Sequence, residues 1–188
     1  MNKELSGSVA IVGAAESDLG KVPGMTALEM QAQASLRALN DAGLRLQDVD
    51  GVFAHTDDRF AGLQLAEYLG IRPSYIDSTN VGGMSNILHV GHAMAAIAAG
   101  MCSVALVTYG STQLSSGTRK VGGAFDGARS PVGQFISPYG QLNPIGYYAM
   151  AANLHMHRYG TTSEQLAEVA VAARKWAQLN PKAYRTEP

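Results

Sequence analysis

The sequence predicts an α/β fold built on a mostly parallel sheet. Apolar runs alternate with helical segments through residues 1–110, and short connections join them. The apolar runs show no polar alternation, as is typical of strands that helices cover on both faces. The helical segment at 85–99 is almost wholly apolar. A helix without a polar face is covered on all sides, so we expect it to lie between two stacked α/β units.

The predicted strands are short runs rich in β-branched and other apolar side chains. They cover residues 8–15, 49–55, 74–78 and 102–110. The predicted helices between them cover residues 25–43, 59–70 and 85–99. Thr26 and Glu29 have capping-box spacing, and Gly43 suits the left-handed position after the last turn.

The chain changes character at residue 111. Residues 111–144 are rich in Gly, Ser and Pro, and we expect a loop of about 34 residues that acts as a lid or binding loop. Two further helices are predicted over 145–160 and 161–180. For the second, both Thr161 with Glu164 and Thr162 with Gln165 have capping-box spacing.

Composition excludes several classes of function. The 188 residues carry a formal net charge of −1, which gives no basis for a nucleic-acid or anionic-membrane partner. The single cysteine, Cys102, excludes an internal disulfide framework and a multi-cysteine metal site. The sequence has neither a signal peptide nor an apolar stretch of about 18 residues, so we expect a cytoplasmic protein. Glycines at 13 and 20 alone do not make a dinucleotide-binding motif.

The corner Gly82-Gly83-Met84-Ser85 joins the third strand to the apolar helix. A helix N-terminus presents unpaired N–H groups and partial positive charge, so this corner could activate a nucleophile or hold an oxyanion. Ser85 is its one side-chain nucleophile, and three roles stay open: capping the helix, contacting an oxyanion or ligand, and nucleophilic attack.

Histidines and tyrosines are further candidates. His89 and His92 share a helix face, either as a metal pair or as buried, hydrogen-bonded side chains. We expect the second, and no metal site. His155 and His157 flank Met156 on a later helix. The tyrosines at 109, 139, 147 and 148 are expected to pack.

Four stretches together resemble the N-terminal half of the thiolase superfamily. The similarity is strongest to the branch with the thiolase domain of sterol carrier protein X, whose members are often labelled lipid-transfer protein or acetyl-CoA acetyltransferase. The stretches are VAIVGAAES, ALNDAGLRLQDVDGVFAH, NVGGMSNILHVGHAMAAIAAGMCSVALVTYGS and YGTTSEQLAEVAVAARKWAQLNPKA. Their order and spacing cover almost the whole chain.

The resemblance implies half of a five-layered α-β-α-β-α fold whose buried central helix packs against its counterpart from the second half. In the family a nucleophilic cysteine stands at the start of that helix, and its position falls on Gly83 here. Cys102 lies at the other end of the helix and is expected to be a small buried residue. The later segment would cover the active site, with His157 near it. Arg119, Lys120 and Arg129 would meet the phosphates of coenzyme A, or be solvated loop residues.

The resemblance also implies an organisation and a set of partners. Residues 1–110 would form the α/β core, residues 111–188 the covering loop region with two helices, and the second thiolase half would be missing. A homodimer, a chain carrying that half, or a small OB-fold zinc-ribbon protein would then be the partner.

The implied function is action on an acyl-CoA thioester without a covalent cysteine. Two reactions are candidates. One is acyl transfer, and the other is C–C bond formation or cleavage, as in cysteine-less retro-aldolases. The tyrosines that such aldolases use belong to the missing half. The alternatives are a non-catalytic acyl-CoA- or lipid-binding subunit and an inactive truncated half. No tightly bound cofactor is expected, and coenzyme A enters as part of the substrate.

Overall fold

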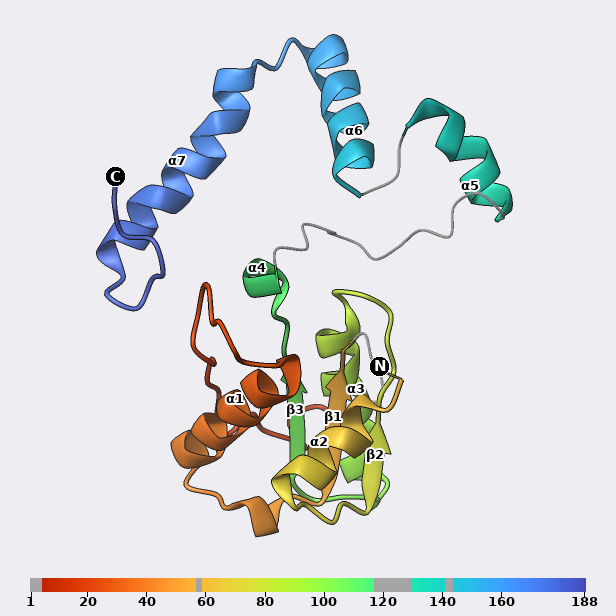
Figure 1. Ribbon diagram of the computed structural model, residues 1–188, viewed down its shortest axis with the longest axis vertical. Helices are drawn as coiled ribbons and strands as arrows, with labels where there is room; N and C mark the ends of the chain where they lie inside the picture. The colour runs from red at the N-terminus through yellow and green to blue at the C-terminus, as the bar shows by residue number, and fades with distance from the viewer. Residues whose placement is uncertain (1–4, 57–58, 117–129, 141–143) are drawn as a thin grey trace. The chain divides into compact units, whose positions relative to one another are not determined.

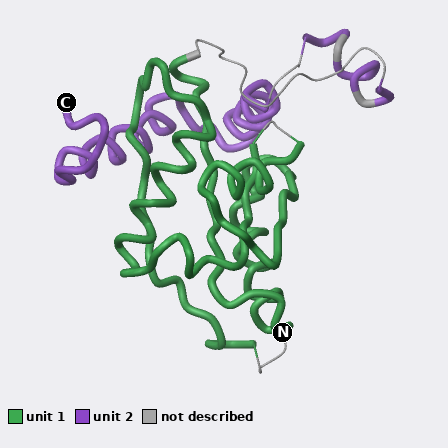
Figure 2. Tube along the Cα trace, turned by 60° about the horizontal axis from the view of Figure 1, so that its bottom comes forward, with its two compact units in different colours: residues 1–118 green, residues 119–188 purple. Residues whose placement is uncertain are grey.

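The computed structural model describes residues 5–56, 59–116, 130–140 and 144–188. It divides the chain into two compact units, residues 1–118 and residues 119–188 (Figure 2). The sheet and the predicted corner both belong to the first unit. The predicted boundary at residue 110 stays a prediction.

A three-stranded parallel sheet forms the centre of the first unit, in the order β2-β1-β3. The strands are β1 (Gly51–His55), β2 (Tyr75–Asp77) and β3 (Ala105–Tyr109). Every residue of the central strand β1 is buried, as predicted for a strand covered on both faces. Val52 is in register with Ile76 on one side and with Leu106 on the other.

Helices cover the two faces of this sheet, which makes the unit a layered α/β structure (Figure 1). The helices α1 (Ala27–Ala42) and α2 (Ala61–Leu69) pack on one face, and α3 (Ser85–Ala98) packs on the other. Alternate side chains of β1 therefore enter different cores. Val52 and Ala54 join the cluster around Leu65, whereas Phe53 packs with Ala93 of α3.

Local signals in the sequence fix the helix ends. The predicted capping box at Thr26 and Glu29 is present, and Gly43 closes α1 in the left-handed conformation with a φ of 68°. Helix α7 (Ser163–Leu179) is capped by Thr162 with Gln165, the second of the two predicted pairs.

The predicted strand at residues 8–15 is wrong, because this segment joins no strand pair in the structure. It lies along α1 instead: a Cβ on Gly13 would clash with the Ala38 carbonyl oxygen, and the Ala14 N–H donates to Asp41. Ile11 is left 80% exposed. An apolar β-branched run becomes a strand only where a neighbouring strand pairs with it, and no described segment does so here.

The predicted loop at 111–144 contains short helices where the structure describes it. They are α4 (Gln113–Ser116), α5 (Pro131–Ile136) and the 3-10 turn η3 (Ser137–Tyr139). Proline at the first position of α5 suits a helix start. In the second unit, α6 (Pro144–Tyr159) and α7 match the two predicted helices, and neither contains a buried residue. Over the parts of the chain that are described, no helix has the length and apolarity to cross a membrane.

Candidate functional site at the corner before α3

The chain leaves β2 at Asp77 and enters α3 at Ser85 through the glycine corner. Gly82 has a φ of +74°, a conformation that favours glycine, whereas Gly83 lies outside the left-handed region. A Cβ built on Gly83 would meet no atom within 4 Å. Glycine at 83 is therefore not required by the backbone, and a side chain would fit there.

Ser85 closes this corner from the inside. Its side chain is fully buried, its hydroxyl donates to the Gly82 carbonyl oxygen at 2.7 Å, and it accepts from the Val81 N–H at 2.9 Å. Both bonds hold the backbone of the corner, a role close to the predicted cap, although Ser85 is the first residue of the helix rather than its N-cap. The predicted catalytic role of Ser85 stays a prediction, and it would need this hydroxyl to exchange a backbone partner for a substrate.

The outer surface of the corner is exposed backbone and one apolar side chain. Gly82 and Gly83 are both exposed, and Met84 is 69% exposed. The outer face of α3 continues this surface with Ile87 and Val90, which are exposed too. The expectation that α3 is covered on all sides is therefore met on one face only. Among the described residues of the first unit, none covers the other face, which is an exposed apolar surface.

Each of the three parallel strands ends in a titratable side chain: His55 on β1, Asp77 on β2 and Tyr109 on β3. With His89 and His92 of α3, these side chains form what we call the strand-end cluster. The carboxyl ends of parallel strands are where ligands of α/β proteins bind. Asn80 connects the corner to this edge, because its side-chain amide donates to the Thr56 carbonyl oxygen at 2.9 Å.

Asp77 is the acceptor at the centre of the cluster. Its Oδ1 accepts from the Thr79 N–H at 2.7 Å and from the Thr79 hydroxyl at 2.6 Å, and its Oδ2 lies 2.5 Å from His92 Nδ1. Partial burial, the largest single influence, acts to raise the pKa of Asp77, but the bonds from Thr79 and His92 outweigh it and the pKa is lowered. Asp77 is thus held as a carboxylate that joins β2, the turn after it and α3.

His89 is fully buried beside this carboxylate. Its Nε2 lies 4.0 Å from Asp77 Oδ1, and neither ring nitrogen has a hydrogen-bond partner among the residues that the structure describes. Its ring lies edge-on to His55, with 5.6 Å between the ring centroids. The predicted hydrogen-bonded histidine is therefore His92, while His89 is buried without such a bond.

A metal site at the histidine pair gains no support. Over the described ranges, no group of three His, Cys, Asp or Glu side chains has an arrangement that could hold a metal ion. His92 is instead paired with the Asp77 carboxylate. Tyr109, expected to pack, stacks on His55 at a centroid distance of 4.8 Å while staying 47% exposed.

The remaining predicted residues lie elsewhere. Arg119, Lys120 and Arg129 fall outside the described residues. His157 lies exposed on α6, in the second unit, and its neighbour His155 contacts Thr161. Cys102 is buried, as predicted, and burial together with the charge of Asp50 raises the pKa of its thiol.

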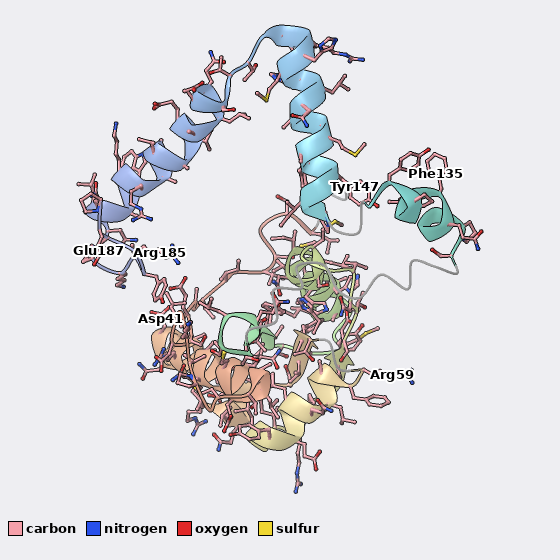
Figure 3. All side chains as sticks on the ribbon, turned by 45° about the horizontal axis from the view of Figure 1, so that its top comes forward. Asp41, Arg59, Phe135, Tyr147, Arg185 and Glu187 are labelled. Atoms are coloured by element: carbon pink, nitrogen blue, oxygen red, sulfur yellow. The ribbon has the colours of Figure 1, made fainter. Side chains whose placement is uncertain are left out.

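Sequence reasoning missed Asp77 and His55 as candidates. Both were within predicted strands, where they resemble ordinary strand residues. The usable signal was positional: each is the last residue of its strand, on the edge where the corner also lies. Figure 3 shows that side chains crowd together around the sheet of the first unit, whereas those of the second unit are spread along its helices.

No family model matches the sequence. The chain is 35% identical, over 96% of its length, to a steroid side-chain-cleaving aldolase of Thermomonospora curvata. It is 37% identical, again over 96% of its length, to a 17-hydroxy-3-oxo-4-pregnene-20-carboxyl-CoA lyase of Mycobacterium tuberculosis. It covers 47% of the first relative and 48% of the second, so the chain spans about half the length of these curated relatives.

A less similar relative is an acetyl-CoA acetyltransferase of Methanothermobacter thermautotrophicus, 29% identical over 93% of this chain and 46% of the relative. Among solved structures, the Ltp2-ChsH2(DUF35) aldolase matches 93% of this chain and 44% of its own, with a TM-score of 0.77 and 32% identity. These likenesses show the fold: the chain has the α/β thiolase-like architecture of the corresponding part of such proteins.

Proposed function

We propose that this chain acts on acyl-CoA thioesters as part of a carbon–carbon lyase of the retro-aldol type. The observation that carries the proposal is the corner at Gly83, which has room for a side chain and carries none. A covalent acyl-enzyme needs a nucleophile, and the corner offers only Ser85, whose hydroxyl is buried and bonded to backbone. The two relatives above 30% identity are named as an aldolase and a CoA lyase, which supports cleavage.

The proposed reaction needs no bond between the acyl group and the protein. In a β-hydroxyacyl-CoA, a base takes the hydroxyl proton, a carbonyl forms at the β-carbon, and the α–β carbon bond breaks. Its electron pair passes to the α-carbon and on to the thioester oxygen as an enolate, and protonation of the α-carbon then releases a shorter acyl-CoA. The N–H groups at the start of α3 would stabilise the enolate oxygen, since a helix N-terminus favours negative charge.

Gly82, Gly83, Met84 and Ser85 would line the substrate site in this proposal, and the predicted role of His157, on α6 in the second unit, stays a prediction. Arg119, Lys120 and Arg129 would bind the phosphates of coenzyme A through charge-assisted hydrogen bonds. A charge-reversal variant at each of these three positions should weaken coenzyme A binding in isothermal titration calorimetry. Arg72→Glu, on the connection between α2 and β2, is the matched control and should leave the affinity unchanged.

Acyl transfer, the other reaction that the resemblance implied, gains no support from the two more similar relatives. Mass spectrometry separates the two reactions. After incubation with a β-hydroxyacyl-CoA, the chain should keep its mass, because no acyl group becomes attached. A stable mass increase that disappears in Ser85→Ala would contradict the proposal and support covalent transfer at Ser85.

The cleavage assay uses the chain together with a polypeptide that supplies the rest of the relatives' length. The apolar face of α3 that is exposed within the first unit supports such a partner, whether a second copy, a chain carrying the other thiolase-like half, or a zinc-ribbon protein as a further component. The expected result is release of a ketone or aldehyde and a shortened acyl-CoA by the mixture. If the chain binds coenzyme A but cleaves no substrate with any of these partners, the second candidate is favoured, a non-catalytic acyl-CoA-binding subunit. The absence of an exposed side-chain nucleophile at the corner also supports this candidate.

A further inference from the structure

Helix α7 of the second unit is followed by a segment that folds back along it (Figure 1). Asn180 makes the reversal: its side-chain oxygen accepts from the Lys182 N–H at 3.0 Å, and its carbonyl oxygen accepts from the Ala183 N–H at 3.0 Å. Further along the chain, the Arg174 guanidinium donates to the Glu187 carbonyl oxygen at 2.5 Å. These contacts hold the returning segment against the second half of α7.

A groove of about 400 Å³ lies between α7 and the returning segment. Much of its lining is apolar and short, because it includes the alanines at positions 170, 173, 177 and 183. The three alanines on α7 are spaced i, i+3 and i+7, so they share one face of the helix. Small-molecule sites have volumes of about 300–1,000 Å³ and mostly apolar walls. The groove therefore has the size and the lining of a site for a small ligand.

Arg174, Tyr184 and Arg185 complete the lining of the groove. Tyr184 is 57% exposed and Arg185 is exposed as well, so a ligand in the groove can reach both side chains. Arg174 gives one N–H to the returning segment, out of the five that a guanidinium carries. Aromatic rings and guanidinium planes both stack on flat ring systems. The groove thus combines partners for a flat ring with donors for an anion.

The chain around the groove is positively charged. This stretch has four cationic side chains, Arg174, Lys175, Lys182 and Arg185, and one carboxylate, that of Glu187. Among the residues that the structure describes, none of the four cations forms an ion pair with a carboxylate. Like charges gathered on one short stretch repel one another and attract an anion. Charge complementarity therefore favours an anionic ligand.

We infer that this groove binds a phosphorylated adenosine, whose phosphate meets Arg174 and Arg185 and whose adenine stacks on Tyr184. Guanidinium groups bind phosphate through charge-assisted bidentate bonds, and an aromatic ring stacks on any nucleobase. Coenzyme A carries a 3′-phosphorylated adenosine at the end away from its thiol, so the groove holds this end of an acyl-CoA. Only the identification with coenzyme A rests on the proposed lyase function. The three loop cations of that proposal would then bind the diphosphate.

Isothermal titration calorimetry of the full chain with adenosine 3′,5′-bisphosphate tests the groove without any thioester. Arg185→Glu should weaken binding by about ten- to hundredfold, because it removes one charge-assisted contact and places a carboxylate beside the phosphate. Arg158→Glu is the matched control. It makes the same change of charge on α6, in the same unit but outside the lining of the groove, and it should change the affinity less than about threefold.

Tyr184 tests the stacking. Tyr184→Ala should weaken binding of the bisphosphate about five- to hundredfold, whereas Tyr184→Phe, which keeps the ring, should bind as the wild type does. Inorganic pyrophosphate should bind at least about tenfold more weakly than the bisphosphate, because it has no base to stack. Neither Tyr184 nor Arg185 makes a side-chain hydrogen bond or ion pair within the described ranges, so these variants should fold, which circular dichroism checks.

Three results overturn the inference: no binding of the bisphosphate at about 1 mM, equal affinities of Arg185→Glu and the wild type, or pyrophosphate binding as tight as that of the bisphosphate. Displacement of the bisphosphate by coenzyme A supports the identification with that ligand. Displacement by ATP but not by coenzyme A overturns this identification and leaves a free nucleotide as the ligand. Because the bisphosphate has no thioester, a chain that binds it but has no lyase activity contradicts only the proposed function.

Discussion

The two adjacent glycines of the corner should respond in opposite ways to the same substitution. Gly82 has a φ of +74°, where a side chain costs about 1–2 kcal/mol. Gly83 lies outside that region, and a Cβ at this position would have no atom within 4 Å, so alanine there should stabilise by about 0.4–1 kcal/mol through the unfolded chain. Gly83→Ala should therefore exceed Gly82→Ala in stability by roughly 1.5–3 kcal/mol.

Urea unfolding followed by circular dichroism measures the difference, with the wild-type chain as the reference for both variants. Because the substitutions are neighbours and identical in chemistry, differences in side-chain burial or expression do not confuse the comparison. Equal destabilisation by both variants would refute the reasoning. It would mean that position 83 also needs glycine for its backbone, and that the missing side chain says nothing about catalysis.

Three further predictions concern the fold around the site. Asp77→Asn should remove acid-sensitive stability, because the lowered pKa of Asp77 gives stability that is present above about pH 4 and is lost as the pH falls through the folded-state pKa. The urea midpoints of wild type and variant should therefore converge at low pH. A difference in midpoint that persists there would count against the ion pair. Leu65→Ala should cost about 2–5 kcal/mol in urea unfolding, because Leu65 is fully buried, whereas the exposed Leu63→Ala on the same helix should change stability by less than about 0.5 kcal/mol. Cys102, buried and with a raised pKa, should be alkylated only after unfolding, and rapid labelling of the native chain by iodoacetamide would show that its end of α3 opens.

The sequence was sufficient for elements whose signals are local. The capping box of Thr26 with Glu29, the glycine that ends α1 and the apolar run of β1 each depend on neighbours within a few residues, and all three are present. The corner before α3 could also be located, because a strand, two glycines and a helix follow one another along the chain. Two capping pairs were possible for α7, and only geometry could choose Thr162.

Features that depend on distant neighbours could not be predicted in the same way. The run at residues 8–15 has the composition of a strand, but pairing is a property of two segments, and here the run lies along α1. The strand-end cluster brings together His55, Asp77 and Tyr109 from three separate strands, and it is the parallel register that aligns those strands. Nothing local in the sequence marks these three residues as neighbours.

The first half of helix α3 has the reverse of the usual polarity, whereas Ala93 and Ala96 of its second half are buried in the apolar cluster with Phe53. Its buried side carries Ser85 and His89, while Ile87, 79% exposed, and Val90 face outward. Burying each such side chain fully is worth about 1.5–3 kcal/mol, a contribution that the described residues of the first unit do not realise on this face. A partner that covered this face would therefore link folding to assembly through α3. Such a partner would raise the melting temperature in proportion to the logarithm of its concentration. The measured stability of this chain would then depend on whether the partner is present and at what concentration.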